Sequence, residues 1–74
     1  MARLRPLPFR KVDRALRRLG FVPVRTRGSH VQYRHPDGRL TTVPAHAAKD
    51  VSVGLLRSLL RFLDLSVDEF ERLD

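Results

Sequence analysis

The chain contains no cysteine, which excludes disulfide bonds, a thiolate nucleophile and a zinc ribbon. This absence fits a reducing compartment, and we expect the protein to be cytoplasmic. No apolar run approaches the length of a membrane-spanning helix or of a signal-peptide core, so we expect a soluble, unprocessed chain. Because 74 residues leave room for only one hydrophobic core, we expect a single domain over residues 1–74.

Acidic residues are scarce in the first half of the chain. Residues 1–39 hold 11 Lys and Arg against 2 acids, a net charge of +9, whereas residues 40–74 hold 4 against 6, a net charge of −2. Together they account for the formal net charge of +7. This concentration of positive charge indicates a polyanionic partner, most simply nucleic acid. A solvated basic surface and an acidic protein partner are the alternatives.

A helix is expected from Pro8 to Leu19. Proline is tolerated in a first turn, and Gly20 suits a left-handed C-terminal cap. The apolar residues follow a helical spacing, at Val12, Ala15, Leu16 and Leu19. The other positions make a basic outer face: Arg10, Lys11, Arg14, Arg17 and Arg18.

Three strands are expected next. The first covers Phe21–Thr26 and is an edge strand or is interrupted, because Pro23 lacks the N–H that a ladder needs. A turn over Arg25–Ser29 follows, with Gly28 free to take a positive φ. The second strand, Val31–His35, and the third, Arg39–Val43, are joined by the turn sequence "PDGR".

The expected turn also sets the register. If His35 lies opposite Arg39, then Tyr33 faces Thr41 and Val31 faces Val43. The apolar side chains Val31, Tyr33 and Val43 then share the face that the helices cover. The other face is left open and carries His30, Gln32, Arg34, Leu40 and Thr42.

Two more helices complete the expected order. Ser52, or alternatively Asp50, caps a second helix with a broad apolar stripe of Leu55, Leu56, Leu59, Leu60 and Leu63. Asp64 and Leu65 end it. Ser66 and Glu69 form a capping-box pair at the start of a short helix through Phe70 and Leu73. The fold class is therefore α+β, a helix, a three-stranded antiparallel sheet, a helix and a short C-terminal helix.

The available chemistry argues against a metal site. The acids cluster late in the chain, far from the basic half, and two-metal chemistry needs several convergent carboxylates. A three-histidine zinc site is conceivable, but the register places His30 and His35 on opposite sheet faces. We therefore expect no metal and no cofactor.

Acid–base chemistry on RNA remains. RNA carries its own nucleophile, the 2′-hydroxyl, so a protein needs a base, positioning and charge stabilisation. Histidine suits the base because its ordinary pKa of about 6.5 lies near neutral pH, and arginines stabilise phosphate charge. His30 is the candidate for this base. The alternative interpretation is that His30 is an exposed residue without a catalytic role. The general acid stays open between His46, Lys49, Tyr33 and water.

Several of these residues also have purely structural interpretations. Tyr33 falls on the apolar face and is expected in the core. His35 adjoins the turn and is expected to be a solvated turn histidine. His46 and Lys49 can equally cap or pair within the loop that they occupy, and Arg34 can be solvated surface or a phosphate contact.

An ordered series of motifs resembles a known family. It comprises "LRRLGFV", "GSH" at residues 28–30, "TVPAH" at 42–46, "KD" at 49–50 and "GLLRSLLR" at 54–61. The series covers nearly the whole chain from Phe9 onward and is similar to the HicA family of type II toxin–antitoxin toxins. Two positions depart from the family pattern: Leu55, where threonine is frequent, and Ala47–Ala48, where polar residues or proline are common.

The resemblance implies a double-stranded-RNA-binding-like α-β-β-β-α fold and the activity of an mRNA interferase. It places the family's catalytic histidine at His30. It also implies growth arrest until a cognate HicB-type antitoxin covers the active face.

Our leading hypothesis is a metal-independent endoribonuclease toxin with mRNA and an antitoxin as partners. The expected RNA-binding residues are Arg14, Arg17, Arg18, Arg25, Arg27, Gly28, Ser29, Arg34 and Lys49. A non-catalytic RNA-binding module of the same fold is the first alternative, and a protein-interaction subunit that never meets RNA is the second. The sequence leaves the oligomeric state open, a monomer included.

Overall fold

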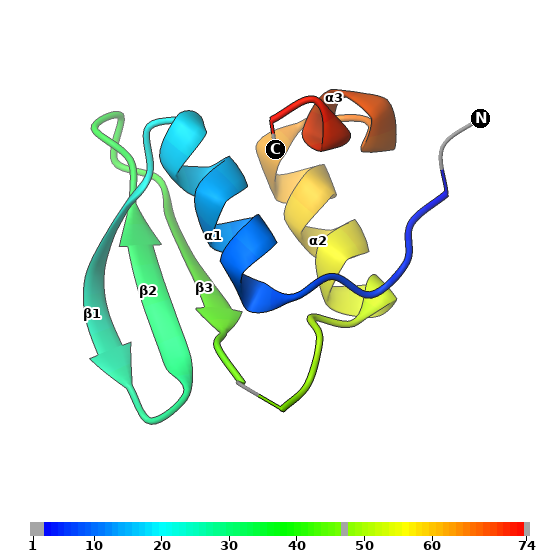
Figure 1. The fold of residues 1–74 in the computed structure, drawn as a ribbon. Coiled ribbons are helices and arrows are strands. Elements are labelled where there is room, and N and C mark those ends of the chain that lie inside the picture. Colours follow the sequence, from blue (N-terminus) through cyan, green and yellow to red (C-terminus); the bar gives the residue numbers. More distant parts are fainter. Residues whose placement is uncertain (1–2, 47, 74) are drawn as a thin grey trace.

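A helical layer covers one face of a three-stranded sheet (Figure 1). The computed structural model describes residues 3–46 and 48–73. The elements are α1 (Phe9–Arg18), β1 (Val22–Arg27), β2 (His30–Arg34), β3 (Leu40–Pro44), α2 (Val53–Leu63) and α3 (Val67–Glu71). The sheet is antiparallel with the order β1-β2-β3, which confirms the expected α+β fold class.

The register between β2 and β3 is the one that the sequence predicts. Tyr33 pairs with Thr41 and Val31 with Val43. Beyond the strands, the His35 N–H donates to the Arg39 carbonyl at 2.9 Å, and Gly38 has a φ of +97°. The short turn therefore determines which residues face the helices, because side chains alternate strictly along a strand.

The turn between β1 and β2 is shorter than expected. The predicted turn over Arg25–Ser29 is wrong, because β1 continues through Arg27 and only Gly28 and Ser29 connect the strands. Gly28 supplies the positive φ, +59°, that such a tight connection needs. The irregularity at Pro23 is confirmed: the register shifts between Pro23 and Arg25, and β1 is an edge strand.

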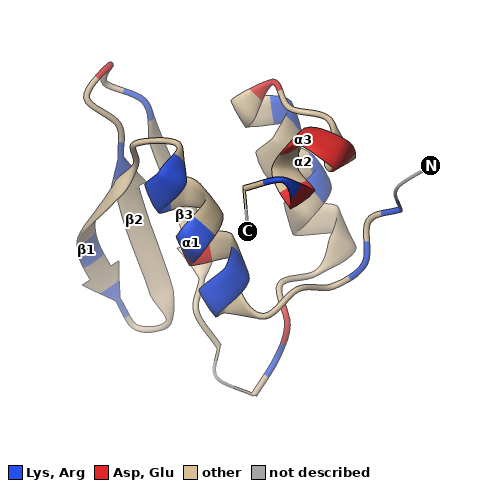
Figure 2. Ribbon diagram, turned by 45° about the horizontal axis from the view of Figure 1, so that its top comes forward, with Lys and Arg blue, Asp and Glu red and all other residues tan. Residues whose placement is uncertain are grey.

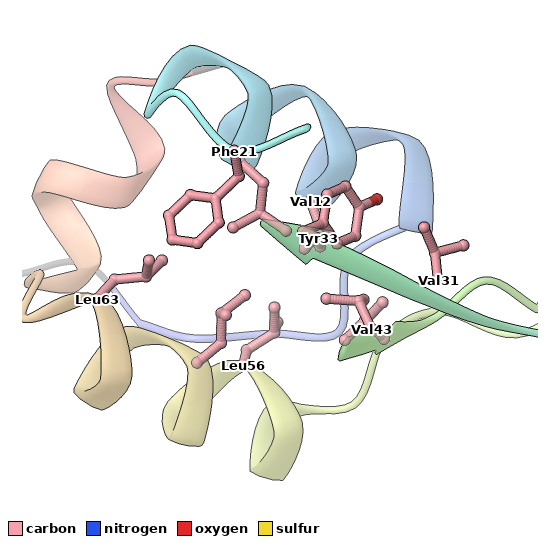
Figure 3. Packing of buried hydrophobic residues seen from close by; sticks show 10 residues of the cluster. Val12, Phe21, Val31, Tyr33, Val43, Leu56 and Leu63 are labelled. Carbon is pink, nitrogen blue, oxygen red and sulfur yellow. The ribbon is translucent and has the colours of Figure 1, made fainter. Parts of the chain in front are cut away.

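The core lies between the sheet and the helices (Figure 3). Val12 and Leu16 of α1 and Leu56 of α2 are fully buried there, together with Tyr33. The other members are Phe21, Val31, Val43, Val51, Leu59 and Leu63. A smaller cluster of Ala15, Leu60 and Phe70 joins α1, α2 and α3. The face that carries Val31, Tyr33 and Val43 is therefore the covered one, as expected.

The helix ends follow their expected caps. The Ser52 hydroxyl accepts from the Leu55 N–H at 3.3 Å, so Ser52 and not Asp50 caps α2. Asp64 ends that helix in the left-handed region, at a φ of 57°. Ser66 and Glu69 form the predicted capping box at α3. Within the described residues, no helix has the length and apolar character needed to cross a membrane.

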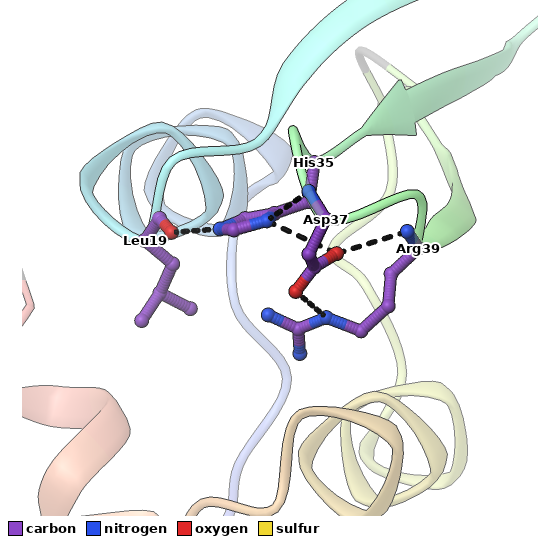
Figure 4. A network of polar contacts seen from close by, with 4 residues as sticks. All are labelled: Leu19, His35, Asp37 and Arg39. Atoms are coloured by element: carbon purple, nitrogen blue, oxygen red, sulfur yellow. Dashed lines mark hydrogen bonds and ion pairs between the residues drawn. The ribbon is translucent and has the colours of Figure 1, made fainter.

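Two expectations about single side chains are wrong. Leu55 is 43% exposed, because it lies at the flank of α2 and not on its buried stripe. His35 is not a solvated turn residue. Its Nε2 donates to the Leu19 carbonyl at 3.0 Å, and its Nδ1 accepts from the Asp37 N–H at 3.1 Å (Figure 4). Its ring also lies edge-on to that of Phe21. His35 therefore joins the β2–β3 turn to the end of α1.

Candidate functional site

The sheet surface opposite the helices, here called the open face, carries the candidate site. It comprises the residues that alternate with the more buried ones along β2 and β3, together with their partners in β1, where every residue is exposed. These are Val22, Arg25, Arg27, His30, Gln32, Arg34, Leu40 and Thr42. Because each stands across from a neighbour of the same set, the face extends over all three strands. The expectation that His30, Gln32, Arg34, Leu40 and Thr42 share one face is confirmed.

His30 lies at the first position of β2, between arginines of β1 and the end of β3. It pairs with Arg27 on one side and with Pro44 on the other. Arg25 pairs with Gln32, one step further along the sheet. The side chains of Arg25, Arg27, His30, Gln32 and Thr42 line one shallow hollow with a volume of about 210 Å³. Directly paired residues of an antiparallel sheet have Cα atoms about 4.5–5.5 Å apart, so these groups can reach one ligand together.

The polar groups of this hollow are uncommitted. Within residues 3–46 and 48–73, no hydrogen bond or ion pair engages the His30 imidazole, and no carboxylate pairs with Arg25, Arg27 or Arg34. Arg17 and Arg39, in contrast, are bound to Asp13 and Asp37 at 2.9 and 2.8 Å. Two unpaired guanidinium groups beside an exposed imidazole, with that of Arg34 at the other end of β2, form a surface suited to phosphate.

The turn and the connection after β3 lie at the same end of the sheet as His30. The Ser29 carbonyl accepts from the Ala45 N–H, which ties the β1–β2 turn to the chain just beyond β3. His46 is exposed and follows two residues after Pro44, the partner of His30. Lys49 is exposed in the same connection, and its N–H donates to the His46 carbonyl at 3.3 Å.

The α1 arginines belong to the other side of the molecule (Figure 2). Arg14, Arg17 and Arg18 are exposed on the outer surface of α1, where they line a separate hollow with Arg10 and Asp13. Helix α1 packs on the covered face through Val12 and Leu16. The basic residues that the sequence grouped as one RNA-binding set are thus divided between two surfaces, with the sheet between them.

Tyr33 does not take part in the open face. It is fully buried, and its hydroxyl donates to Asp13 Oδ1 of α1 at 2.6 Å. The pKa of the Tyr33 hydroxyl is raised well above its ordinary value of 10.0, mainly by burial and to a lesser extent by this hydrogen bond. The geometry therefore removes Tyr33 from the general-acid candidates and confirms its expected place in the core.

Two members of the hollow are not among the binding residues that the sequence predicts. They are Gln32 and Thr42, which the predicted register puts on the open face. The predicted register could have identified them, because it pairs Gln32 with Thr42 directly beside His30 on the open face. For metals, no three His, Asp or Glu side chains of the described residues gather closely enough to hold an ion.

The fold and this face together define a small basic α+β domain that presents one histidine and several arginines on an open sheet. A family model, the HicA toxin of bacterial toxin–antitoxin systems, matches residues 9–65. The chain therefore belongs to the HicA toxin family, as its motifs suggested. It is the toxin of a toxin–antitoxin pair, and the family implies a cognate antitoxin as its partner. No curated protein matches the chain.

Proposed function

We propose that this toxin is a metal-independent endoribonuclease that cleaves mRNA in the cytoplasm, with His30 as the catalytic residue. The single observation that carries the proposal is the shared hollow of His30, Arg25 and Arg27 on the open face. An RNA strand lying across the sheet meets an exposed imidazole and two cations at one place. Recognition through phosphate and hydroxyl contacts suits a shallow face without a deep base pocket.

The proposed reaction needs no bound cofactor. The His30 imidazole accepts the proton of the 2′-hydroxyl, and that oxygen attacks the neighbouring phosphorus. The bond from phosphorus to the 5′-oxygen breaks, and the departing oxygen takes up a proton. The products are a 2′,3′-cyclic phosphate and a 5′-hydroxyl. Arg25 and Arg27 stabilise the negative charge that grows on the phosphoryl oxygens during the attack.

His46 is our proposed general acid. It is exposed, it belongs to the connection that is tied to the β1–β2 turn, and it follows the strand partner of His30. Lys49 lies in the same connection and is the charged group that we propose to hold the next phosphate. Gly28 and Ser29 bring the RNA backbone close at the turn, because neither carries a bulky side chain there.

The phosphate contacts divide according to the geometry. Arg25, Arg27 and Arg34 contact RNA directly on the open face, where no described carboxylate neutralises them. Arg14, Arg17 and Arg18 on α1 attract RNA through their field, which acts over about 10 Å at moderate salt. The antitoxin, we propose, neutralises the toxin by covering the open face, so that His30 and these arginines are occupied together.

The test uses purified, antitoxin-free protein and a single-stranded RNA in EDTA. Wild-type protein is expected to give ends with 2′,3′-cyclic phosphate, and His30→Ala is expected to lose cleavage by about 10²–10⁴-fold while it still binds RNA. A substrate with one 2′-deoxy sugar at the cleaved position serves as the chemical control. Cleavage by His30→Ala, or of the deoxy substrate, would contradict the mechanism. Intact RNA with a salt-sensitive mobility shift would favour the non-catalytic binding module.

A further inference from the structure

The two edges of the sheet are built differently. Edge strand β1 carries Arg25 and Arg27, contains Pro23 and is interrupted by a register shift. Charges, proline and bulges are the devices by which proteins prevent an edge from pairing with another strand. Edge strand β3 has no charged residue and no register shift, and its one proline, Pro44, is its last residue. β1 thus carries three such devices, whereas in β3 only the terminal Pro44 and the shortness of the strand limit pairing.

The backbone of β3 offers regular hydrogen-bonding groups on its outer side. Within the described residues β3 pairs only with β2. The hydrogen bonds from His35 to Arg39 and from Ala45 to Ser29 set the phase of this ladder. Because bonded and non-bonded pairs alternate in antiparallel sheets, the N–H and C=O groups of Leu40 and Thr42 point away from β2. Pro44 offers a carbonyl there but no donor.

An apolar groove runs beside this edge, between β3 and α2. It has a volume of about 120 Å³, and none of its lining residues is charged: Thr41, Thr42, Val43, Pro44, Val51, Leu55, Ser58, Leu59 and Phe62. Leu55 and Phe62 are 43% and 40% exposed, and Leu40 is 51% exposed on the same strand. The cations of α2, Arg57 and Arg61, line a different hollow together with Leu60 and Leu65.

We propose that β3 is a self-association edge, at which two copies of this chain pair β3 with β3 in antiparallel fashion around a two-fold axis at Thr42. The register of the ladder selects a second copy as the occupant, because β3 can pair with itself so that the outward N–H groups of Leu40 and Thr42 each meet a carbonyl. The net charge of +7 on each chain opposes association, and contact along β3 minimises this repulsion because neither the strand nor the groove beside it carries a charged residue. An acidic partner would gain no electrostatic attraction from this edge and would be drawn to the arginines of the open face or of α1.

The register around Thr42 satisfies the exposed groups without opposing like charges. The two Thr42 residues exchange both of their hydrogen bonds, and each Leu40 N–H donates to the Pro44 carbonyl of the other copy. The missing donor of Pro44 therefore falls at the end of the ladder. Arg39 comes opposite Ala45, so no arginine faces its own copy. A two-fold axis perpendicular to the sheet also brings the two α2 helices to the same side, which covers Leu55 and Phe62.

The same symmetry joins the two open faces. The dimer has one six-stranded antiparallel sheet, with both His30 side chains on its uncovered side and all helices on the other. This inference goes beyond the proposed nuclease, and the readouts below involve no RNA. Its failure would leave the cleavage hypothesis untouched.

Crosslinking tests the register, because the chain contains no cysteine of its own. In the His30→Ala background, chosen to limit toxicity during expression, Thr42→Cys should give a disulfide-linked dimer on mild oxidation. The paired Cα atoms would be about 5.5 Å apart, within the range that a disulfide spans. Val24→Cys, 51% exposed on the other edge, is the matched control and should stay monomeric. Equal crosslinking of the two variants would overturn the proposal.

Sedimentation equilibrium over a wide concentration range tests the association itself. The antitoxin-free protein should reach twice the chain mass of 8.5 kDa. Leu55→Lys places like charges at the joint and should weaken association by about tenfold or more, whereas Val24→Lys should not. A single-chain mass at every concentration overturns the proposal. So does hydrogen-exchange protection of β3 that appears only when antitoxin is added, since the edge would then belong to the antitoxin.

Discussion

The Tyr33 hydroxyl, on the covered face of the sheet, donates a 2.6 Å hydrogen bond to Asp13 Oδ1 of α1. The second oxygen of Asp13 accepts from Arg17 Nε at 2.9 Å, so one carboxylate holds the central strand and the helix surface at once. Residues 20 positions apart are thereby joined, and α1 is kept on the face opposite His30. The layer that positions the site therefore depends partly on a polar contact at the edge of the core.

Tyr33→Phe should lower the free energy of unfolding by about 1.5–3 kcal/mol, because a hydrogen bond to a charged group is lost while the ring stays packed. Chemical denaturation of both proteins measures the difference. Asp13→Asn is the companion variant, and it should be destabilised less than Asp13→Ala because the amide oxygen still accepts. If Tyr33→Phe left the free energy of unfolding unchanged, the hydrogen bond would make no net contribution to stability.

The same contact predicts alkaline sensitivity. The pKa of Tyr33 is raised in the folded protein, first by burial and then by the hydrogen bond to Asp13. A raised pKa contributes stability that is fully present below the ordinary value of 10.0 and is lost as the pH rises above it. The wild-type melting temperature should therefore fall more steeply above pH 10 than that of Tyr33→Phe. Parallel curves would contradict this.

Gly20→Ala should be more damaging than Gly38→Ala, although the two glycines have nearly equal φ values of +98° and +97°. The backbone strain of a left-handed alanine costs about 1–3 kcal/mol at either position. Only at Gly20 would the added Cβ also come within 2.9 Å of His35 Nε2, whereas at Gly38 it would meet open space. Thermal or urea unfolding of the two variants isolates the contact with His35.

The control for this comparison is the double variant Gly20→Ala with His35→Ala. Removing the imidazole leaves the strain but relieves the close approach, so the two substitutions should be less than additive. Full additivity would show that the His35 ring moves aside at no cost.

Acid should destabilise the protein partly through two exposed carboxylates. The pKa of Asp37 is lowered chiefly by the hydrogen bond from the Arg39 N–H, and that of Glu69 chiefly by the bond from the Ser66 N–H. Lowered pKa values contribute stability above the ordinary values of 3.8 and 4.5, and this stability is lost as the pH falls below them. Asp37→Asn with Glu69→Gln should flatten the acid limb of a melting-temperature profile, and an unchanged limb would contradict this.

RNA binding should depend on salt through the open face. Each phosphate contact of single-stranded RNA adds about 0.7 to the slope of log affinity against log salt. Arg25→Gln and Arg27→Gln should each lower that slope, measured by titration at several salt concentrations. Arg61→Gln, which removes the same charge from α2, is the matched control and should change the slope little. If all three variants lowered the slope equally, RNA binding would depend on the net charge of the protein and not on the open face.

Local chain chemistry accounts for the predictions that held. The sequence "HPDG" allows one tight turn, and that turn sets the register from His35 to Val31. Strict alternation then places His30 and Gln32 on the open face. The helix caps at Ser52 and Ser66 are equally local, since their partners lie three residues away. The extent of β1 was misjudged for the opposite reason. Arg25 and Arg27 are strand residues because they pair with Gln32 and His30 of β2. Arg25 also follows a register shift, which no short sequence pattern predicts.

The order of elements, the caps, the β2–β3 register and the exposure of His30 were thus determined by the sequence alone, because each depends on spacing within a few residues. Tertiary structure decided how the basic residues are shared between surfaces. Packing of Val12 and Leu16 turns the α1 arginines away from the sheet face where Arg25 and Arg27 adjoin His30. It also decided that His35 bonds Leu19 and packs on Phe21. Contacts between residues far apart in the chain exist only once the helices have docked.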